Sequence, residues 1–259
     1  MDKVVSSAAA AIEGIESGMS LAVGGFGLCG IPSVLIQAIH DAGLTDLEAV
    51  SNNCGVDGWG LGILLGAKRL RRMVASYVGE NKEFERQYLT GELEVELTPQ
   101  GTLAERLRAG GAGIGAFFTP SGVGTVVANG GMPWKYDADG SVAISSPPKE
   151  VREFHGRRMV LETGIEADVA LVRAAVADRH GNLRFHAAAQ NFNPPAAMSG
   201  RLTIVEAEKV VEPGELDPAD VHVAGVFVDR VVALTPEQAQ FKMIEKRTTT
   251  PRPGTDEEA

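Results

Sequence analysis

The chain has 259 residues, of which 44% are hydrophobic and 22% are charged, a composition typical of globular proteins. Its formal net charge of -10 excludes a general affinity for nucleic acid or for an anionic membrane surface. No apolar run approaches the roughly 18 residues that a transmembrane helix requires. The first segment is alanine-rich but broken by Glu13 and Gly14. It predicts an amphipathic helix rather than a signal peptide, so we expect a cytoplasmic protein.

The first half of the chain alternates short apolar runs with segments of helical periodicity. The apolar runs predict strands at residues 20–23, 47–50 and 72–76. The helical segments are residues 32–42, 62–66 and 102–108. Pro32 suits the first turn of its helix and Gly43 follows the end of that helix. This order of elements is typical of a parallel sheet covered by helices, so we predict a single α/β domain.

The second half of the chain is richer in strands. Its apolar runs are residues 142–144, 159–161, 169–172 and 202–205. Between the last two, Asp178 to Asn182 (DRHGN) predicts a tight turn that joins two strands. We find no linker and no internal repeat, and we place the domain at residues 1–246. Residues 247–259 are polar and contain proline, which predicts a disordered tail.

The sharpest local motif is the glycine-rich run from Gly24 to Pro32, between a predicted strand and a predicted helix. Residues 25–30 match the dinucleotide-binding pattern GxGxxG, in which glycines allow a ligand to approach and a helix N-terminus favours anions. A nicotinamide-binding protein should carry an acidic residue about 20 residues later. Asn52 and Asn53 occupy that place, which argues against a dehydrogenase. A glycine-rich turn needed only for packing is the other alternative.

A longer pattern contains this run. Residues 18–32 (GMSLAVGGFGLCGIP) resemble the A-side signature of family I CoA-transferases, in which a glycine, a short apolar strand, GGF and GxP follow one another. The family usually has Asp or Asn where this chain has Ser17, and serine also supports turns. The resemblance covers about residues 3–235. Its further segments are residues 51–57, 76–88, 91–106, 110–113, 118–120 and 191–193. Residues 77–88 and 92–106 resemble succinyl-CoA:3-oxoacid enzymes more than the 3-oxoadipate or acetate branches.

The resemblance implies the fold of the CoA-transferase superfamily and a covalent mechanism. In that family a glutamate carboxylate attacks the acyl-CoA carbonyl, and the glutamate lies in a Ser-Glu-Asn-Gly motif of the B half. No Ser-Glu-Asn-Gly occurs in this chain. The resemblance therefore implies a partner B subunit, in a heterodimer or heterotetramer, and no catalytic nucleophile in this chain. It also implies no metal and no cofactor, because the coenzyme A thioester is a substrate, together with a 3-oxoacid such as acetoacetate.

The resemblance also assigns two groups of binding residues. The coenzyme A group is Gly24, Gly25, Phe26, Gly27, Leu28, Cys29 and Gly30. Asn52, Asn53 and Gln100 match positions that the family is thought to use for substrate carboxylates, which need hydrogen-bond donors in a dry pocket. The two asparagines end a predicted strand, at the edge where open α/β sheets bind ligands, and Gln100 follows Pro99 in a loop before the next helix. Loop capping and turn formation are the alternative for the asparagines.

Other functions and residues stay open as alternatives. A CoA-ester hydrolase or ring-opening enzyme could use the same fold, and the chain could be a non-catalytic scaffold subunit. The basic cluster at residues 68–72 could hold coenzyme A phosphates, although a solvated helix end is the favoured interpretation. We expect Cys29 and Cys54 to be reduced and neither to be catalytic.

Overall fold

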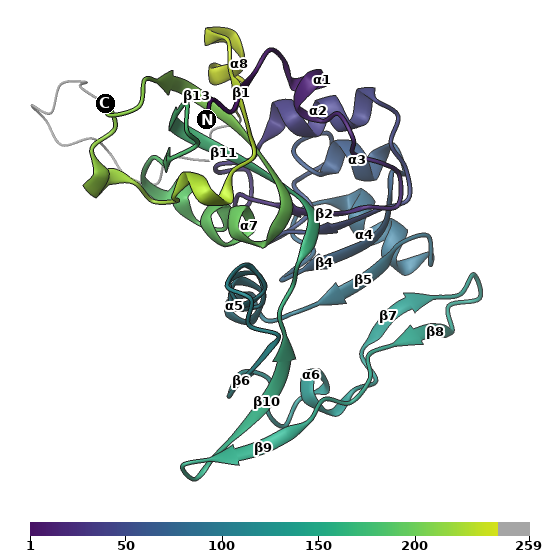
Figure 1. Cartoon of the computed structure of the whole chain (residues 1–259). Coiled ribbons are helices and arrows are strands. Elements are labelled where there is room, and N and C mark those ends of the chain that lie inside the picture. Colours follow the sequence, from purple (N-terminus) through teal and green to yellow (C-terminus); the bar gives the residue numbers. More distant parts are fainter. Residues whose placement is uncertain (243–259) are drawn as a thin grey trace, which may run out of the picture.

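A nine-stranded sheet forms the centre of the computed structural model, which describes residues 1–242 (Figure 1). Its strands are β1 (Val4–Val5), β2 (Ser20–Val23), β3 (Leu47–Val50), β4 (Leu70–Ala75), β5 (Glu94–Leu97), β11 (Ala167–Asp178), β12 (Leu183–Arg184), β13 (Gly200–Val211) and β14 (Arg230–Ala233). Their order across the sheet is β1-β14-β13-β11-β2-β3-β4-β5, with β12 paired to β11. The described pairs are parallel except for β11 with β12, which confirms the predicted α/β class with a mainly parallel sheet.

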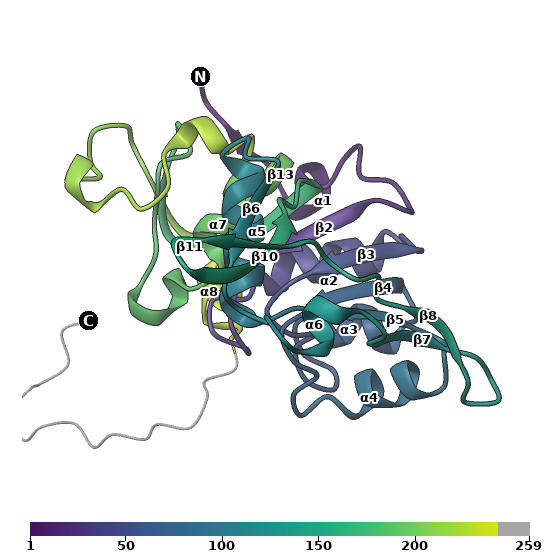
Figure 2. The ribbon, with the colours of Figure 1, turned by 90° about the horizontal axis from the view of Figure 1, so that it is seen from below.

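Helices cover both faces of this sheet (Figure 2). The helices are α1 (Ala8–Ala11), α2 (Ser33–Asp41), α3 (Gly62–Gly66), α4 (Lys82–Leu89), α5 (Gln100–Gly111), α7 (Asn193–Ser199) and α8 (Pro236–Gln240). Side chains alternate along a strand, so Leu21 and Val23 pack with α1 to α4, whereas Ala22 packs with α5 and α7. Each face of the sheet therefore has its own hydrophobic core.

Strand β2 lies where the order of strands reverses. From β2, the strands β3, β4 and β5 follow one another to one side of the sheet, and β11, β13 and β14 follow to the other. Ligands of open α/β sheets bind beyond the carboxyl ends of the strands at such a reversal. The glycine loop, which we define as residues 24–30, follows β2 directly and lies at this point. Its first N–H, at Gly24, donates to the carbonyl of Leu171 on β11 at 2.9 Å.

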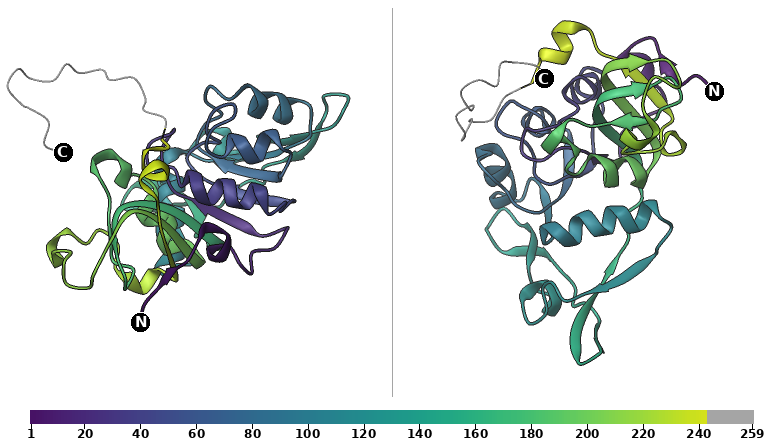
Figure 3. Two further views of the ribbon diagram at one scale, coloured as in Figure 1. Left: turned by 90° about the horizontal axis from the view of Figure 1, so that it is seen from above. Right: turned by 90° about the vertical axis from the view of Figure 1, so that its left-hand side faces the viewer.

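An extension of small antiparallel sheets projects from the domain between α5 and β11 (Figure 3). Its elements are β6 (Ala116–Thr119), α6 (Val126–Asn129), β7 (Pro133–Tyr136), β8 (Val142–Ser145), β9 (Val151–Phe154) and β10 (Arg157–Thr163). β7 packs beside the edge strand β5, where the guanidinium of Arg72 lies 5.5 Å from the ring centre of Trp134. The hydroxyl of Tyr88 donates to the carbonyl of Pro133 at 2.7 Å, which holds the extension against α4.

Most of the elements predicted from the sequence are present. The strands at residues 20–23 and 47–50 and the helix at residues 62–66 have the predicted bounds. The predicted turn also forms, because Asp178 Oδ1 accepts hydrogen bonds from the backbone N–H groups of His180 and Asn182, both at 2.9 Å, and β11 pairs with β12 across it. These elements were predictable because apolar periodicity and local turn chemistry determine them.

Three predictions need correction. The N-terminal segment is not one amphipathic helix: Val4–Val5 form β1 beside β14, and only Ala8–Ala11 are helical. Pairing with β3 and β5 moves the predicted strand at residues 72–76 to Leu70–Ala75. The helix predicted at residues 102–108 extends to Gln100–Gly111, so Gln100 begins the helix and is not in a loop.

The tail predicted at residues 247–259 lies outside the described residues. Within residues 1–242 no helix is long and apolar enough to cross a membrane.

Candidate functional site

Neutral polar side chains gather beyond the carboxyl ends of β3 and β4. Asn52 Nδ2 donates to Ser76 Oγ at 2.9 Å and approaches Gln100 Oε1 at 3.5 Å. Asn53 Nδ2 donates to the hydroxyl of Tyr77 at 3.2 Å. We call these five residues the amide cluster. The structure therefore brings Asn52 and Gln100 together as expected from the sequence, and it places Asn53 against an aromatic hydroxyl.

The register of the sheet explains how the amide cluster forms. Val50 lies opposite Val74, so the residues that follow β3 and β4 continue side by side. The Ser76 N–H and Ser76 Oγ both donate to the Asn52 carbonyl at 2.9 Å. Ser76 thus holds Asn52 at two points, its backbone carbonyl and its side-chain amide. Asn52 is buried, whereas Gln100 and Tyr77 are exposed, so the cluster runs from the interior to the surface.

Ser76 and Tyr77 are site residues that the sequence alone did not reveal. Both begin the segment 76–88, which carries part of the family resemblance, but no local pattern separates them from the helix that follows. The sheet register reveals them, because they lie opposite Asn52 and Asn53.

The glycine loop meets the amide cluster at its tip. It forms a small hairpin in which the N–H groups of Phe26 and Cys29 each donate to the other residue's carbonyl, at 3.0 and 2.9 Å. At the turn of this hairpin, the N–H of Gly27 lies 3.4 Å from Asn52 Oδ1, so it can donate a weak hydrogen bond. The predicted coenzyme A loop and the predicted acid-binding amides therefore face one another.

A second hairpin of the same form follows β3. Val56 and Trp59 pair across it as Phe26 and Cys29 pair across the first. A methyl group placed on Gly60 would lie 3.5 Å from Ile31 Cγ2, so the two hairpins are neighbours. We predicted no internal repeat from the sequence, yet glycines at positions 25 and 30 recur with the same spacing at positions 55 and 60. That spacing is the signal that could have shown the second loop.

The helix N-terminus behind the glycine loop is already occupied by a carboxylate of this chain. Glu206 Oε2 accepts hydrogen bonds from the N–H groups of Val34 and Leu35 in the first turn of α2, both at 2.9 Å. In a dinucleotide-binding protein a phosphate would take this position. The structure therefore adds a second argument against the dehydrogenase alternative, besides the asparagines that replace the ribose-binding acid.

The charged residues that the sequence singled out lie elsewhere. The basic cluster 68–72 is at the amino end of β4, the edge opposite the amide cluster. There Arg72 pairs with Glu48, Glu94 and Glu96 at distances of 3.2, 2.8 and 2.5 Å. Within residues 1–242, no Asp or Glu side chain hydrogen-bonds to Asn52, Asn53 or Gln100. The amide cluster thus offers donors for an acid but no carboxylate nucleophile.

The two cysteines differ in their surroundings. Cys29 is half-buried in the glycine loop, whereas Cys54 is buried in the core below it. Burial raises the pKa of the Cys54 thiol well above its usual range. A thiol that stays protonated at neutral pH is a poor nucleophile, so Cys54 has the properties of a core residue.

The sequence has extensive likeness to one family of known proteins. The sequence profile described as coenzyme A transferase matches residues 5–234. A relative from Mycobacterium tuberculosis, named as the A subunit of a probable succinyl-CoA:3-ketoacid coenzyme A transferase, is 66% identical over 96% of this chain and 99% of its own. A mouse relative, succinyl-CoA:3-ketoacid coenzyme A transferase 2A, mitochondrial, is 49% identical over 94% of this chain. That match covers 47% of the mouse protein.

A solved structure shares the fold. The apoenzyme of an acyl-CoA transferase from Escherichia coli O157:H7 superposes with a TM-score of 0.76 and 23% sequence identity. The superposition covers 92% of this chain and 48% of the Escherichia coli chain, so this chain spans about half the length of that protein.

Proposed function

The chain belongs to the coenzyme A transferase family, and we propose that it is the A half of a two-subunit enzyme. The enzyme moves coenzyme A from succinyl-CoA to a 3-oxoacid such as acetoacetate. One observation carries the proposal most directly: a cluster of neutral amides without a carboxylate lies beside the glycine loop at the reversal point of the sheet. The name of the relative that is 66% identical supports the same substrates.

The amide cluster binds the acid substrate in this proposal. Because Gln100 Oε1 faces Asn52, the Nε2 group of Gln100 keeps its donors for a carboxylate. Hydrogen bonds from amides to a charged acceptor are strong, and amides avoid the desolvation cost of a full ion pair. Asn53, which gives one amide hydrogen to Tyr77 and keeps the other, holds the inner end of the acid. The buried Asn52 orients the exposed Gln100, which holds the outer end.

The glycine loop receives the acyl-CoA. Its hairpin turns the backbone of Gly27 toward the amide cluster, and the missing side chain of this glycine lets a thioester approach closely. The phosphates of coenzyme A bind away from the N-terminus of α2, because the Glu206 carboxylate takes the donors of that turn.

The nucleophile comes from the B subunit. Its glutamate carboxylate attacks the thioester carbonyl, the carbon–sulfur bond breaks, and coenzyme A leaves as a thiolate with a mixed anhydride behind it. The thiolate then attacks the glutamyl carbonyl, which releases succinate and leaves a glutamyl-CoA thioester. The incoming 3-oxoacid carboxylate reverses these steps and leaves as its CoA ester. Each step replaces a thiolate by a carboxylate, or a carboxylate by a thiolate, at an acyl carbon. The reaction therefore needs no metal and no redox cofactor.

The mouse protein supports a partner of this kind, because this chain matches only 47% of it and about half of its length lies outside the match. The proposal includes a heterodimer or heterotetramer with such a B subunit, in the cytoplasm.

Reconstitution tests this function. The chain, its B subunit, and the mixture of the two are each assayed for acetoacetyl-CoA formation from succinyl-CoA and acetoacetate. We expect turnover from the mixture alone. Release of free coenzyme A without acetoacetyl-CoA would indicate a hydrolase instead. Turnover by this chain alone would contradict the proposal that the B subunit supplies the nucleophile.

A further inference from the structure

The buried side chain of Asn193 lies directly behind both ends of the glycine loop. This residue begins α7 and has no exposed surface. A methyl group at Gly24 would lie 2.0 Å from Asn193 Oδ1, and one at Gly30 would lie 2.8 Å from Asn193 Nδ2. Both ends of the loop must therefore be glycine while Asn193 stands between them.

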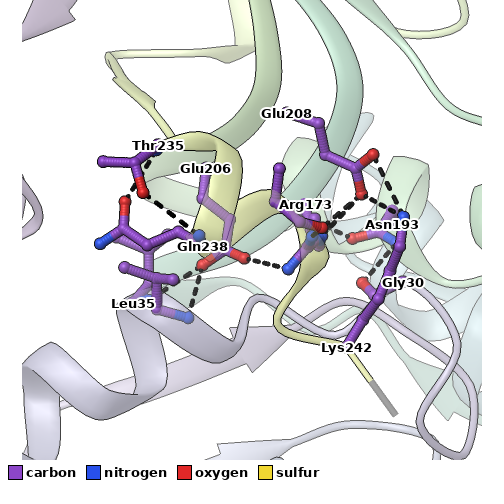
Figure 4. Close-up of polar contacts among 11 residues, drawn as sticks. Gly30, Leu35, Arg173, Asn193, Glu206, Glu208, Thr235, Gln238 and Lys242 are labelled. Atoms are coloured by element: carbon purple, nitrogen blue, oxygen red, sulfur yellow. Dashed lines mark hydrogen bonds and ion pairs between the residues drawn. The ribbon is translucent and has the colours of Figure 1, made fainter. Parts of the chain in front are cut away.

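Asn193 uses both of its amide hydrogens and its side-chain oxygen to tie this loop to the sheet. Its Nδ2 donates to the carbonyls of Gly30 at 3.0 Å and Ala189 at 2.8 Å, and its Oδ1 accepts from the N–H of Arg173 at 3.1 Å (Figure 4). Asn191, two residues earlier, donates to the carbonyl of Cys29 at 3.1 Å. The loop is thus held by amides that lie more than 160 residues away in the sequence.

The side chain of Arg173 extends the same network to helix α2. Its Nη1 donates to Glu206 Oε1 at 3.0 Å, and Glu206 Oε2 accepts from the N–H groups of Val34 and Leu35 (Figure 4). Arg173 and Glu206 are both buried. Arg173 on β11 therefore links two places. Its backbone N–H reaches the end of the glycine loop through Asn193, and its side chain reaches the first turn of α2 through Glu206.

We propose that Asn193, Arg173 and Glu206 form a buried clamp that positions the glycine loop for catalysis without touching either substrate. The clamp holds the loop at Gly24, Gly30 and the first turn of α2, so only the turn of its hairpin is left to face a ligand. At that turn the N–H of Gly27 lies 3.4 Å from Asn52 Oδ1. The clamp thereby fixes the distance between the surface that receives the thioester and the amides that receive the acid.

This inference rests on the proposed function for its kinetic test, and a second readout is independent of activity. The variant is Asn193→Ala in the full chain, assembled with the B subunit. Hydrogen–deuterium exchange is measured for residues 24–31, and KM and kcat are measured with succinyl-CoA and with acetoacetate. The matched control is Asn182→Ala, which removes a part-buried asparagine that also bridges two segments, at Asp178 and Gly225.

We expect exchange at the amides of Phe26 and Cys29 to become at least about tenfold faster in Asn193→Ala, because the loop loses its fixed ends. We expect kcat/KM for succinyl-CoA to fall about ten- to a hundredfold, with a smaller effect on the KM for acetoacetate, because a displacement of about 1 Å in a site has effects of that size. The control should change neither quantity. Loop exchange and kinetics equal to those of the control would overturn the inference.

Asn193→Asp keeps the test decisive if Asn193→Ala does not fold. Aspartate has nearly the same volume and keeps the acceptor for the Arg173 N–H, but it cannot donate to Gly30. The same faster exchange at residues 24–31 is expected, and unchanged exchange would contradict the clamp. If the unmodified complex transfers no coenzyme A, the proposed function fails, whereas the exchange result still decides whether Asn193 holds the loop.

Discussion

The two sides of the glycine loop are built from different chemistry. In front of the loop, the amide cluster is neutral, reaches the surface and keeps donors for a ligand. Behind it, the buried clamp is charged, lies in the interior and uses its donors and acceptors within the protein (Figure 4). Polar groups with spare donors mark a binding surface, whereas a buried network whose donors are all used within the protein marks a support.

Removing one charge from the buried clamp should have the largest effect on the protein. At pH 8, where Glu206 is ionised, Arg173→Ala leaves this carboxylate buried without its cation, and breaking such a pair typically costs about 3–5 kcal/mol. We expect a loss of this size in the free energy of unfolding, measured with urea. Lys242→Ala is the control: Lys242 pairs with Glu208 at 3.0 Å near the surface, and its loss should cost less than about 1 kcal/mol. Equal effects of the two substitutions would show that burial gives Arg173 no special role.

The pH dependence of the free energy of unfolding should reflect the burial of Glu206. Burial raises the pKa of Glu206 to about 7 from its usual 4.5, although Arg173 and the N–H groups of Leu35 and Val34 act to lower it. Between these values the folded protein holds a proton that the unfolded chain has released, so stability falls as pH rises through this window. The contribution is on the order of 3 kcal/mol.

Glu206→Gln tests this sign. Unfolding with urea at pH 5, 6, 7 and 8 should show a flatter dependence in the variant than in the unmodified chain. A parallel decline in both proteins would mean that Glu206 does not titrate in this range.

On the front side, Gln100→Ala should change binding and leave stability alone. Losing one hydrogen bond to a charged group costs about 1.5–3 kcal/mol, or roughly ten- to a hundredfold in binding. We expect KM for acetoacetate to rise by that factor in the reconstituted enzyme, with normal assembly of the complex. Arg108→Ala, at the exposed far end of the same helix, is the control. Kinetics like those of the control would make Gln100 a structural residue.

The smallest effect is expected at Cys54, below the loop. Its thiol is buried and its pKa is raised, so it takes no part in the reaction. Cys54→Ala should keep activity within about twofold and cost about 1 kcal/mol of stability or less, because the change in volume is small. A thousandfold loss of activity with normal unfolding would show that this thiol does take part.

The sequence predicts the amide cluster in front of the glycine loop better than the buried clamp behind it. Local periodicity places Asn52 and Asn53 at the end of a strand, and the glycine spacing marks the loop itself. Ser76 could be recognised only from the pairing of β3 with β4, because no spacing rule relates residues on neighbouring parallel strands. Glu206 lies in an alternating strand segment where it resembles a solvent-facing residue, and its partners are 33 and more than 170 residues away. Long-range partners of this kind leave no local pattern.

We propose that this chain binds and orients the substrates while its partner supplies the nucleophile. The most direct measurement is to mix the two-subunit complex with succinyl-CoA, digest it, and locate the covalently bound coenzyme A by mass spectrometry. We predict a glutamyl-CoA thioester on the B subunit, with none on any glutamate of this chain. A coenzyme A thioester on a glutamate of this chain would contradict the account.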